Sequence, residues 1–556
     1  MSEELHVYFE EGDCPDPEDG SNYVIRNNLG AEDDFWFNTL TGLELPHESR
    51  FSYDKFYAYL LRPSGGNLYV YLETYQKLET KIENRGFKRI VPHDLNEGYL
   101  TVLKDLCDGA DVELVRDSAS SGGSNRRVIF TLSTLLLLFD FVLSSVLGRI
   151  LPSTAAEPED AVLFVPFLGR TESMYPVVEE VGGAVRILTT RSWSSHLLRG
   201  DFVDLYRDPD RRSISAYANG RRILRMVRSL LGLQWSLLVG ELELSTRLSE
   251  YLEGNHRLTA PHTVEYACEK ILAEHTDSVL KSAIMRAAVQ EMDPEEIVVG
   301  GLSPKDIESL RTADELDAGL HYIPHSITHE DEFVPPSVET KVYTTGPADN
   351  RLFKKHYEES DRPVLIPTGK PNVDDLLANL DGVEAKSESH RIVIGTQAYD
   401  DWMREQFFLD SLDAIANCGY DQTVVVKIHP SEGTDFYRQL IAEAETSYEF
   451  DIVIRVKGLR EVLSKADILL TINSNIGVEA IILDTYCISY NPFEPFTFRS
   501  SYIDGNHVPY TTAVPELTEE LDRVIGADSI RSTQREHLDR SYVFGGSAER
   551  IAERIR

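Results

Sequence analysis

The chain is poor in lysine and in positive charge. No lysine occurs between Lys104 and Lys270, and the whole chain has 55 lysines and arginines but 92 acidic residues, a net charge of −37. That sign disfavours general binding to nucleic acid, whose phosphates are also negative. The 42% hydrophobic content is too high for an acidic disordered protein. We favour a halophilic interpretation, a salt-rich cytoplasm whose short Debye length screens self-repulsion.

Cysteine is also scarce, and no targeting pattern opens the chain. The cysteines are scattered, without the spacing of a metal site, which predicts reduced thiols in a cytosolic protein. Residues Met1–Leu5 are acidic and lack the basic-then-apolar pattern of a signal peptide. We therefore expect a protein that stays inside the cell. The five cysteines are Cys14, Cys107, Cys268, Cys418 and Cys487.

One stretch, Val128–Leu151, is unusually apolar. Its length alone would allow a membrane span. Asp140 lies in its middle, and several serines and threonines interrupt it. These polar residues favour a buried or interfacial helix, with a transmembrane span as the alternative.

The length of the chain allows two or three domains with well-filled cores. The first twenty or so residues are acidic and contain two prolines, which predicts a mobile tail. An apolar run at Leu68–Leu72 then predicts a first strand, and helical and strand patterns alternate beyond it. The predicted parts are the tail over 1–20, an N-terminal acceptor domain with helical insertions over 21–370, a connector over 371–390 and a C-terminal donor domain over 391–556.

Three short β-branched runs in the last part, 391–394, 423–428 and 467–472, break off into small polar residues before a helical pattern follows. In a parallel sheet these breaks fall at the carboxyl edge, where open doubly wound folds bind their ligands. The residues expected at this edge are Gly395, Thr396, Gln397, Lys427, His429, Pro430, Ser474, Asn475 and Glu479.

The residue types after two of these runs suit a phosphate. Ser474 and Asn475 are good N-cap types for the helix that carries Glu479. The free N–H groups of its first turn favour an anion by about 0.3–1 kcal/mol. His429 offers a second donor to the same phosphate, and Glu479 can accept hydrogen bonds from a ribose or sugar hydroxyl. The alternative is that His429-Pro430 merely ends a strand and Ser474-Asn475 merely caps a helix.

The third run adds further groups. Gly395 permits a close approach of the backbone, and Thr396 and Gln397 can hydrogen-bond to a phosphate or a base. Lys427 can stabilise charge on a phosphate, or it can point off its strand toward solvent or an acidic neighbour. Together these residues predict a site for a nucleotide-activated sugar, held by its phosphate.

Lys427-Ile428-His429-Pro430, followed by Ser474-Asn475 and Glu479, resembles the paired His-Pro and Ser motifs of capsule-polysaccharide glycosyltransferases. Bacterial polysialyltransferases and CDP-glycerol glycerophosphotransferases carry similar pairs. The resemblance implies the GT-B architecture, an α/β fold in which two Rossmann-like domains face each other across a cleft and the donor binds to the second domain.

Three further segments are similar to the same families. His325 matches a histidine at the close of the first domain, although Ser326 stands where glycine is usual. Thr368–Asp374 resembles a Thr-Gly-x-Pro-x-x-Asp segment near the domain junction. Gly545–Arg550 is similar to a C-terminal Gly-x-Ala-x-x-Arg segment, with serine in place of the alanine. The resemblance assigns His325 to the interdomain cleft.

A catalytic base is expected from the first domain. A clear strand at 161–165 leads into the loop 166–173, which contains Glu172. In GT-B enzymes, loops at this edge face the acceptor and can supply the base. Glu172 is therefore a candidate, with an ordinary exposed loop glutamate as the alternative.

Four arginines, Arg221, Arg222, Arg225 and Arg228, share one face of a predicted helix, and apolar residues lie on the adjacent face. A basic amphipathic helix in so acidic a protein is typical of an interfacial membrane contact. It is equally suited to the pyrophosphate of a lipid-linked acceptor. The alternative is a core-facing helix whose arginines pair with surrounding carboxylates.

The sequence thus predicts an inverting glycosyltransferase that extends a surface glycan from a nucleotide sugar, at the inner face of the membrane or free in the cytoplasm. The one Asp-x-Asp stretch, Asp208–Asp210, lies in the first half, so we expect neither a metal nor a cofactor. A polyol-phosphate transferase, an enzyme like the UDP-N-acetylglucosamine 2-epimerases and a non-catalytic scaffold remain open.

Overall fold

The computed structural model describes the chain in ranges that cover most of its second half. These ranges are 4–8, 21–24, 68–93, 95, 97–110, 112–115, 135, 137–143, 161–166, 174–189, 211–239, 243–302, 304–325, 327–329, 340–355, 363–378, 392–399, 401–444, 448–493, 499–525 and 531–556. The chain forms two compact units. The first consists of Met1–Gly169, Arg186–Ile297 and Leu302–Ala318, and the second of Arg170–Val185, Val298–Gly301 and Gly319–Arg556.

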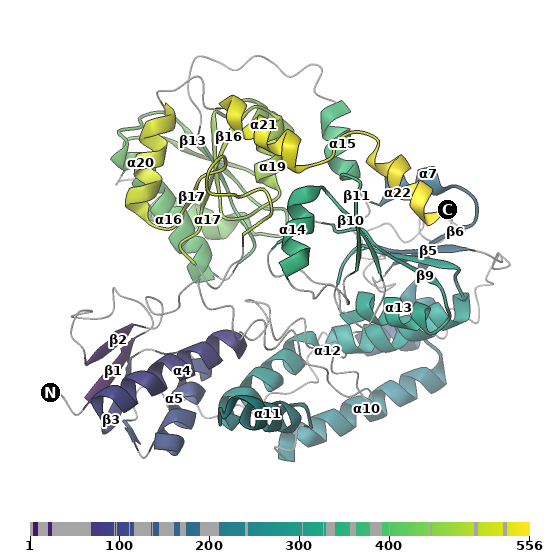
Figure 1. Ribbon diagram of the computed structural model, residues 1–556, viewed down its shortest axis with the longest axis horizontal. Coiled ribbons are helices and arrows are strands. Elements are labelled where there is room, and N and C mark those ends of the chain that lie inside the picture. The colour runs from purple at the N-terminus through teal and green to yellow at the C-terminus, as the bar shows by residue number, and fades with distance from the viewer. Residues whose placement is uncertain are drawn as a thin grey trace. The chain divides into compact units, whose positions relative to one another are not determined.

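The strands form three sheets (Figure 1). The four-stranded sheet has the order β2 (Asn22–Val24), β1 (Glu4–Tyr8), β3 (Arg89–His93), β4 (Glu113–Leu114). The seven-stranded sheet has the order β11 (Val364–Pro367), β10 (Lys341–Thr344), β9 (Gly319–Tyr322), β8 (Glu296–Val299), β5 (Val162–Val165), β6 (Val185–Thr189), β7 (Arg211–Ser213). The six-stranded sheet has the order β14 (Ile452–Arg455), β13 (Val424–Lys427), β12 (Ile392–Gly395), β15 (Ile468–Thr471), β16 (Tyr486–Tyr490), β17 (Tyr510–Thr511).

Helices connect these strands. In the first unit they are α4 (Leu68–Arg85), α5 (Glu97–Ala110), the 3-10 helix η3 (Ile214–Tyr217), α10 (Gly220–Val239), α11 (Glu243–His256), α12 (Pro261–Met292) and α13 (Pro304–Asp314). In the second unit they are α7 (Tyr175–Val181), α14 (Pro347–Lys355), α15 (Pro371–Ala378), α16 (Asp401–Asn417), α17 (Thr434–Ala444), α18 (Leu459–Ser464), α19 (Ile476–Ile482), α20 (Val514–Ile525), α21 (Arg531–Ser541) and α22 (Ser547–Ile555).

All pairs of neighbouring strands in the six-stranded sheet are parallel, each joined to the next in sequence by a helix as far as β16. Both larger sheets alternate with helices in Rossmann-like fashion, which confirms the predicted α/β class. The predicted strands and helices between 392 and 490 are present. How the two predicted domains face each other stays a prediction.

The start of the chain differs from the prediction in two places. Leu68–Leu72, predicted as a strand, is the first part of helix α4. Leu68, Tyr71, Leu72 and Tyr75 are buried at helical spacing, so packing against a helical neighbour outweighs the β propensity of this run. Within the predicted tail, Glu4–Tyr8 forms β1, which is paired on both edges by β2 and β3.

The apolar run 128–151 is described at 135 and 137–143, where 137–143 is helical. Asp140 is 1% exposed, whereas Phe139 beside it is 64% exposed. Asp140 therefore points inward, and the apolar side chains are divided between the two faces. Among the described helices, none combines the length and apolarity that crossing a membrane requires.

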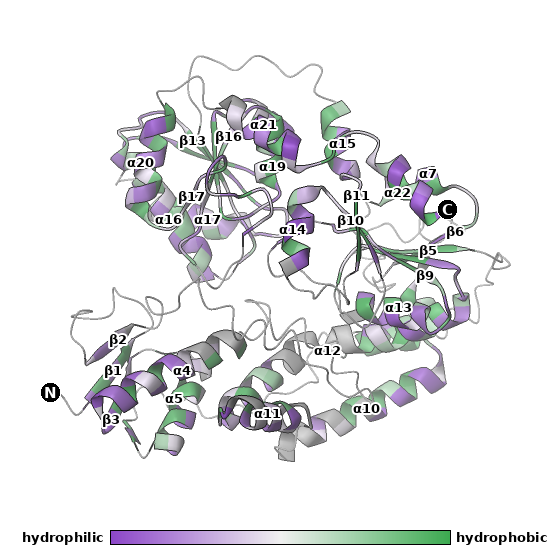
Figure 2. Cartoon of the chain, in the orientation of Figure 1, coloured by the Kyte–Doolittle hydropathy of each residue, from purple (hydrophilic) through white to green (hydrophobic). Residues whose placement is uncertain are grey.

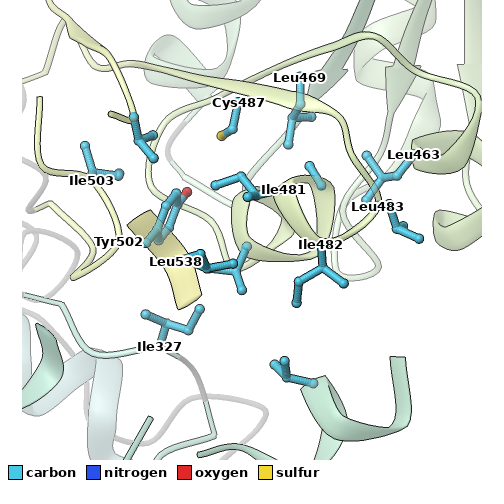
Figure 3. Packing of buried hydrophobic residues seen from close by; sticks show 14 of the residues in the cluster. Ile327, Leu463, Leu469, Ile481, Ile482, Leu483, Cys487, Tyr502, Ile503 and Leu538 are labelled. Atoms are coloured by element: carbon cyan, nitrogen blue, oxygen red, sulfur yellow. The ribbon is translucent and has the colours of Figure 1, made fainter. Parts of the chain in front are cut away.

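The core of the second unit lies around α19, between the six-stranded sheet and the segments 327–373 and 500–544 (Figure 3). Tyr502 is fully buried there and lies beside Leu538 of α21. Gly477 makes this packing possible, because a Cβ at that position would lie 2.3 Å from the Tyr502 hydroxyl oxygen. The core thus fixes α19 and the loop before it.

Candidate functional site

Strands β13, β12 and β15 are adjacent and parallel, so the breaks after them meet at one edge of the six-stranded sheet. The backbone N–H of Thr396 donates to the carbonyl of Lys427 at 3.1 Å, which joins the first two loops. The structure therefore brings together the three segments that the sequence placed at this edge.

Thr396 and Glu432 shape the turn that carries His429. The Thr396 hydroxyl donates to the Glu432 carboxylate, and its oxygen accepts the backbone N–H of His429 at 3.0 Å. The buried Glu432 carboxylate also accepts hydrogen bonds from Tyr437 at 2.7 Å and Arg404 at 3.4 Å. The Thr396 hydroxyl, expected to contact a ligand, thus supports the loop. Nothing in the sequence pattern marked Glu432.

Gln397 and Asn473 join the loop after β12 to the loop after β15. The Gln397 side-chain nitrogen donates to Asn473 Oδ1 at 2.6 Å, and the Asn473 backbone N–H donates to Gln397 Oε1 at 3.0 Å. Tyr399 donates to the same Oδ1 at 2.8 Å. The Gln397 amide is therefore engaged by protein on both of its ends. Asn473 was not predicted as a site residue, although it precedes Ser474 directly.

Close packing accounts for the glycine at position 395. A Cβ at this position would lie 3.2 Å from a Leu469 methyl and 3.3 Å from an Ile476 methyl. The glycine lets the start of α19 pack closely on β12. We expected a ligand to approach the backbone closely at Gly395; in the structure the side chains of Leu469 and Ile476 approach it.

The His429 ring is half-buried. Its Nδ1 accepts the backbone N–H of Ser431 at 3.2 Å and lies 2.6 Å from the Ser431 hydroxyl. In a neutral ring, an Nδ1 that accepts an N–H leaves the proton on Nε2. His429 is therefore set up as an Nε2–H donor. Pro430 after it is exposed and helps to fix the turn.

A group of buried charges lies at the same edge. Lys427 is 5% exposed, and its Nζ donates to the carbonyls of Ile428 at 3.0 Å and Val456 at 2.9 Å. Burial lowers the pKa of Lys427, and Glu479 partly opposes this shift. Lys427 thus does not point to solvent; its acidic neighbour is Glu479.

Glu479 is flanked by a second buried cation, Lys370, which is 4% exposed. Burial raises the pKa of Glu479, and the charges of Lys370 and Lys427 oppose that rise. Two lysines and one carboxylate thus lie close together in this part of the second unit. Lysine ammonium groups bind phosphate as point charges, so this arrangement suits an anionic ligand. Titrating groups with shifted pKa values are typical of functional sites.

The segment that contains Lys370 docks on a second family-like segment. The Asp374 carboxylate accepts the backbone N–H groups of Gly545 and Ser547, each at 2.6 Å, at the start of α22. Arg550 donates to the Thr368 carbonyl at 2.6 and 3.0 Å. The sequence resemblance named these segments, but not their contact or the role of Lys370.

The predicted caps of α19 differ from the structure. Asn475 occupies the N-cap position without a side-chain cap, and its Oδ1 accepts the backbone N–H of Ile327 at 2.8 Å. Ser474 Oγ accepts the N–H of Ile476 at 3.4 Å, and its carbonyl accepts the Tyr502 hydroxyl at 2.8 Å. Asn475 thus holds a distant segment instead of its own helix, which comprises only seven residues.

Of the two predicted catalytic residues outside the donor domain, the structure describes His325 but not Glu172. His325 is half-buried and lies two residues before Ile327, so the Asn475 contact brings its segment to the loop before α19. Glu172 and the Asp208–Asp210 stretch lie outside the described residues.

Helix α10 shows a mixed basic and apolar face. Leu224, Leu231 and Trp235 are 62%, 54% and 66% exposed. They share a stripe of about 120° with three exposed arginines, at 100° per residue. Figure 2 shows hydrophilic and hydrophobic residues mixed along this helix. The exposed arginines are Arg221, Arg225 and Arg228.

The remaining arginine, Arg222, pairs with a carboxylate, as expected for the alternative of a core-facing helix. It pairs with Glu291 of α12 at 3.1 Å and donates to the Tyr217 carbonyl at 2.6 Å. Ile223, Met226 and Leu230 are buried. The helix is thus core-facing on one side and carries its basic residues mainly on the other.

Comparisons with known proteins give structural likenesses only. No family model and no curated protein matches the chain. The UDP-GlcNAc 2-epimerase of Neisseria meningitidis bound to UDP-GlcNAc is 10% identical, with a TM-score of 0.44, over 71% of this chain and 99% of that one. The Methanocaldococcus jannaschii enzyme in complex with UDP-GlcNAc and UDP is 14% identical, with a TM-score of 0.41, over 71% and 99%. A glycosyltransferase from Rickettsia africae is 12% identical, with a TM-score of 0.42, over 71% and 98%.

Likenesses of this size carry no functional argument. The chain's own sheets define it as an α/β protein with two Rossmann-like sheets, and two buried lysines lie near Glu479 beside the second of them.

Proposed function

We propose that the chain is a GT-B glycosyltransferase that binds a nucleotide-activated sugar at the edge formed by β12, β13 and β15. The observation that carries this proposal is that the buried Lys427, at the same sheet edge as His429, and the buried Lys370 both lie near the half-buried Glu479 in the second unit. A diphosphate supplies oxygens for the two lysine ammonium groups, and a ribose supplies hydroxyls for the carboxylate.

In this proposal the two lysines and His429 Nε2–H stabilise charge that develops on the departing phosphate. Preorganised donors in a buried site act most strongly on such charge, because they need no rearrangement when it forms. Transfer proceeds with inversion and without a metal, as the side chains take the electrostatic role. An acceptor hydroxyl, of a surface glycan or a lipid-linked sugar, loses its proton to a base, for which Glu172 and His325 are the candidates.

The binding part is tested by calorimetry with CMP, CDP, UDP, GDP and inorganic pyrophosphate. Replacing Lys427 or Lys370 with methionine is expected to weaken both nucleotide diphosphate and pyrophosphate by about 10- to 100-fold, the loss of one charge-assisted hydrogen bond. Glu479→Gln is expected to weaken only the nucleotide, since pyrophosphate has no ribose. Lys465→Met, which removes a partly exposed lysine that pairs with Glu461, serves as the matched control.

Two results would overturn this assignment. One is a pyrophosphate affinity that neither lysine substitution changes. The other is an equal loss of both ligands in Glu479→Gln, which would mean that the carboxylate only holds the lysines in place.

The reaction itself is tested with a panel of nucleotide sugars and candidate acceptors. Release of free nucleotide that depends on the acceptor supports transfer of the sugar, and release of the nucleoside monophosphate with a polyol phosphate moved to the acceptor supports the polyol-phosphate alternative. Interconversion of the sugar without accumulation of nucleotide supports an epimerase. Absence of binding to every nucleotide supports a scaffold.

We also propose that the exposed face of α10 contacts a membrane of anionic lipids. Exposed arginines with leucines and a tryptophan on one stripe are suited to the boundary between headgroups and acyl chains. Each arginine near an anionic membrane surface contributes about 1 kcal/mol to the free energy of membrane binding. A chain of net charge −37 gains no such attraction from its average composition.

Arg225→Gln combined with Arg228→Gln is therefore expected to weaken binding to vesicles containing phosphatidylserine by about 30-fold, measured by co-sedimentation. Trp235→Ser should weaken it through lost apolar burial. Arg222→Gln is the control, because Arg222 pairs with Glu291. Equal binding to neutral and anionic vesicles, or no effect of the double substitution, would exclude this contact.

A further inference from the structure

Asp504, His507 and His537 form a compact cluster of potential metal ligands in the second unit. Asp504 and His507 lie in the loop before β17, and His537 lies on α21. One ligand atom from each lies within 4.8 Å of the others. Asp504 Oδ2 is 2.7 Å from His507 Nδ1 and 3.4 Å from His537 Nδ1. No other group of this kind occurs among the residues that the structure describes.

The carboxylate is held in place by the backbone of its own loop. Asp504 Oδ1 accepts the N–H groups of Asn506 at 3.1 Å, His507 at 2.8 Å and Val508 at 3.1 Å. These bonds occupy one oxygen and direct the other toward the two imidazoles. Outer hydrogen bonds of this type orient the carboxylates that bind metal ions in proteins.

His537 supplies the buried imidazole of the cluster. The residue is 8% exposed, and its Nδ1 lies 3.4 Å from Asp504 Oδ2. The nitrogen that faces the carboxylate is therefore largely shielded from water.

We propose that Asp504, His507 and His537 bind one divalent transition-metal ion, with zinc as the ion that best suits them. Two imidazole nitrogens and one carboxylate oxygen are a common ligand set for zinc, with water in the fourth position. For ligands at about 2.0–2.1 Å from the ion, neighbouring ligand atoms lie about 3.0–3.4 Å apart, and the two distances to Asp504 Oδ2 are close to this range.

Binding requires one change within the cluster. The His507 and His537 rings are stacked, with centroids 4.6 Å apart and an angle of 13° between their planes. Lone pairs of nearly parallel rings do not converge on one ion, so the partly exposed His507 ring tilts out of the stack.

The ion would connect α21 to the loop that supports the start of α19. In that loop the Tyr502 hydroxyl donates to the Ser474 carbonyl at 2.8 Å, and the Ser500 hydroxyl donates to the Asn473 carbonyl. The role that we propose is therefore structural. The ion would stabilise the loop whose Ser500 and Tyr502 hydroxyls hold Asn473 and Ser474 in place. This role does not depend on which ligand binds at the edge of the six-stranded sheet.

The test uses the full chain without a histidine tag, dialysed against a chelator and then titrated with Zn²⁺. One equivalent is expected to bind, and to raise the midpoint of thermal unfolding by mass action. His537→Gln and Asp504→Asn should each reduce the affinity at least about 10- to 100-fold. His262→Gln is the control, since His262 pairs with Asp108 at 3.4 Å without a third ligand.

X-ray absorption of the wild-type zinc complex keeps the proposal testable if a variant fails to fold. It should show two imidazoles and light oxygen ligands around the ion. Binding of less than one equivalent, an affinity that both substitutions leave unchanged, or a spectrum without imidazole would each overturn the proposal.

Discussion

Replacing His429 with alanine is expected to reduce acceptor-dependent nucleotide release by about 100- to 1,000-fold while the thermal unfolding midpoint stays within about 2 °C. Loss of one preorganised donor to a developing charge has effects of this size on kcat. The unfolding midpoint should hold because the turn is fixed by the backbone N–H of His429, which donates to Thr396 and Glu432 and which alanine retains.

Two companion variants separate catalysis from folding. Ser431→Ala keeps the backbone N–H that holds His429 Nδ1 and should retain most of the activity. His262→Ala, which replaces a partly exposed histidine of the first unit, should change neither the rate nor the unfolding midpoint to this extent. If His429→Ala lowers the unfolding midpoint by much more than about 2 °C, the imidazole is a structural group and the proposed donor role is wrong.

Gly369→Ala is expected to destabilise the second unit by about 2–5 kcal/mol. Its φ of +84° is a conformation that costs a residue with a Cβ about 1–2 kcal/mol. The added Cβ would also lie 2.4 Å from the Val543 carbonyl oxygen, and overpacking of this kind costs about 1–3 kcal/mol. The midpoint of urea unfolding, followed by tryptophan fluorescence, measures the change.

Gly419→Ala provides the comparison. Its φ is +65°, but nothing lies within 4 Å of the Cβ position, so only the conformational cost of about 1–2 kcal/mol applies. Gly369→Ala should also weaken pyrophosphate binding, because Lys370 follows directly. Equal stability of the two variants would show that the segment moves away from Val543 without loss.

The sequence predicted the part of the chain whose elements follow local patterns. From Ile392 to Tyr490, apolar runs and helical patterns alternate, and the strand ends that carry Thr396, His429 and Ser474 meet as expected. At Leu68–Leu72 the same kind of run is a helix. Short apolar runs do not distinguish the two structures, and only packing partners decide between them.

The details of the site depend on contacts between distant residues. Lys370 is more than one hundred residues from Glu479, and the two lie close together because α15, which follows Lys370, packs against α19. Glu432 and Asn473 are ordinary polar residues in the sequence, and their roles come from partners 36 and 76 positions away. The side chain of Asn475, predicted to contact a ligand, also accepts the backbone N–H of the distant Ile327.

The burial of Lys370 and Lys427 in so acidic a chain has a kinetic consequence. An incoming nucleotide first meets the summed field of the whole surface, which is repulsive, and only at contact meets the two hidden cations. Added salt weakens the distant repulsion far more than the attraction inside the site. Nucleotide capture should therefore become faster as ionic strength rises, the reverse of the usual behaviour of phosphate-binding proteins.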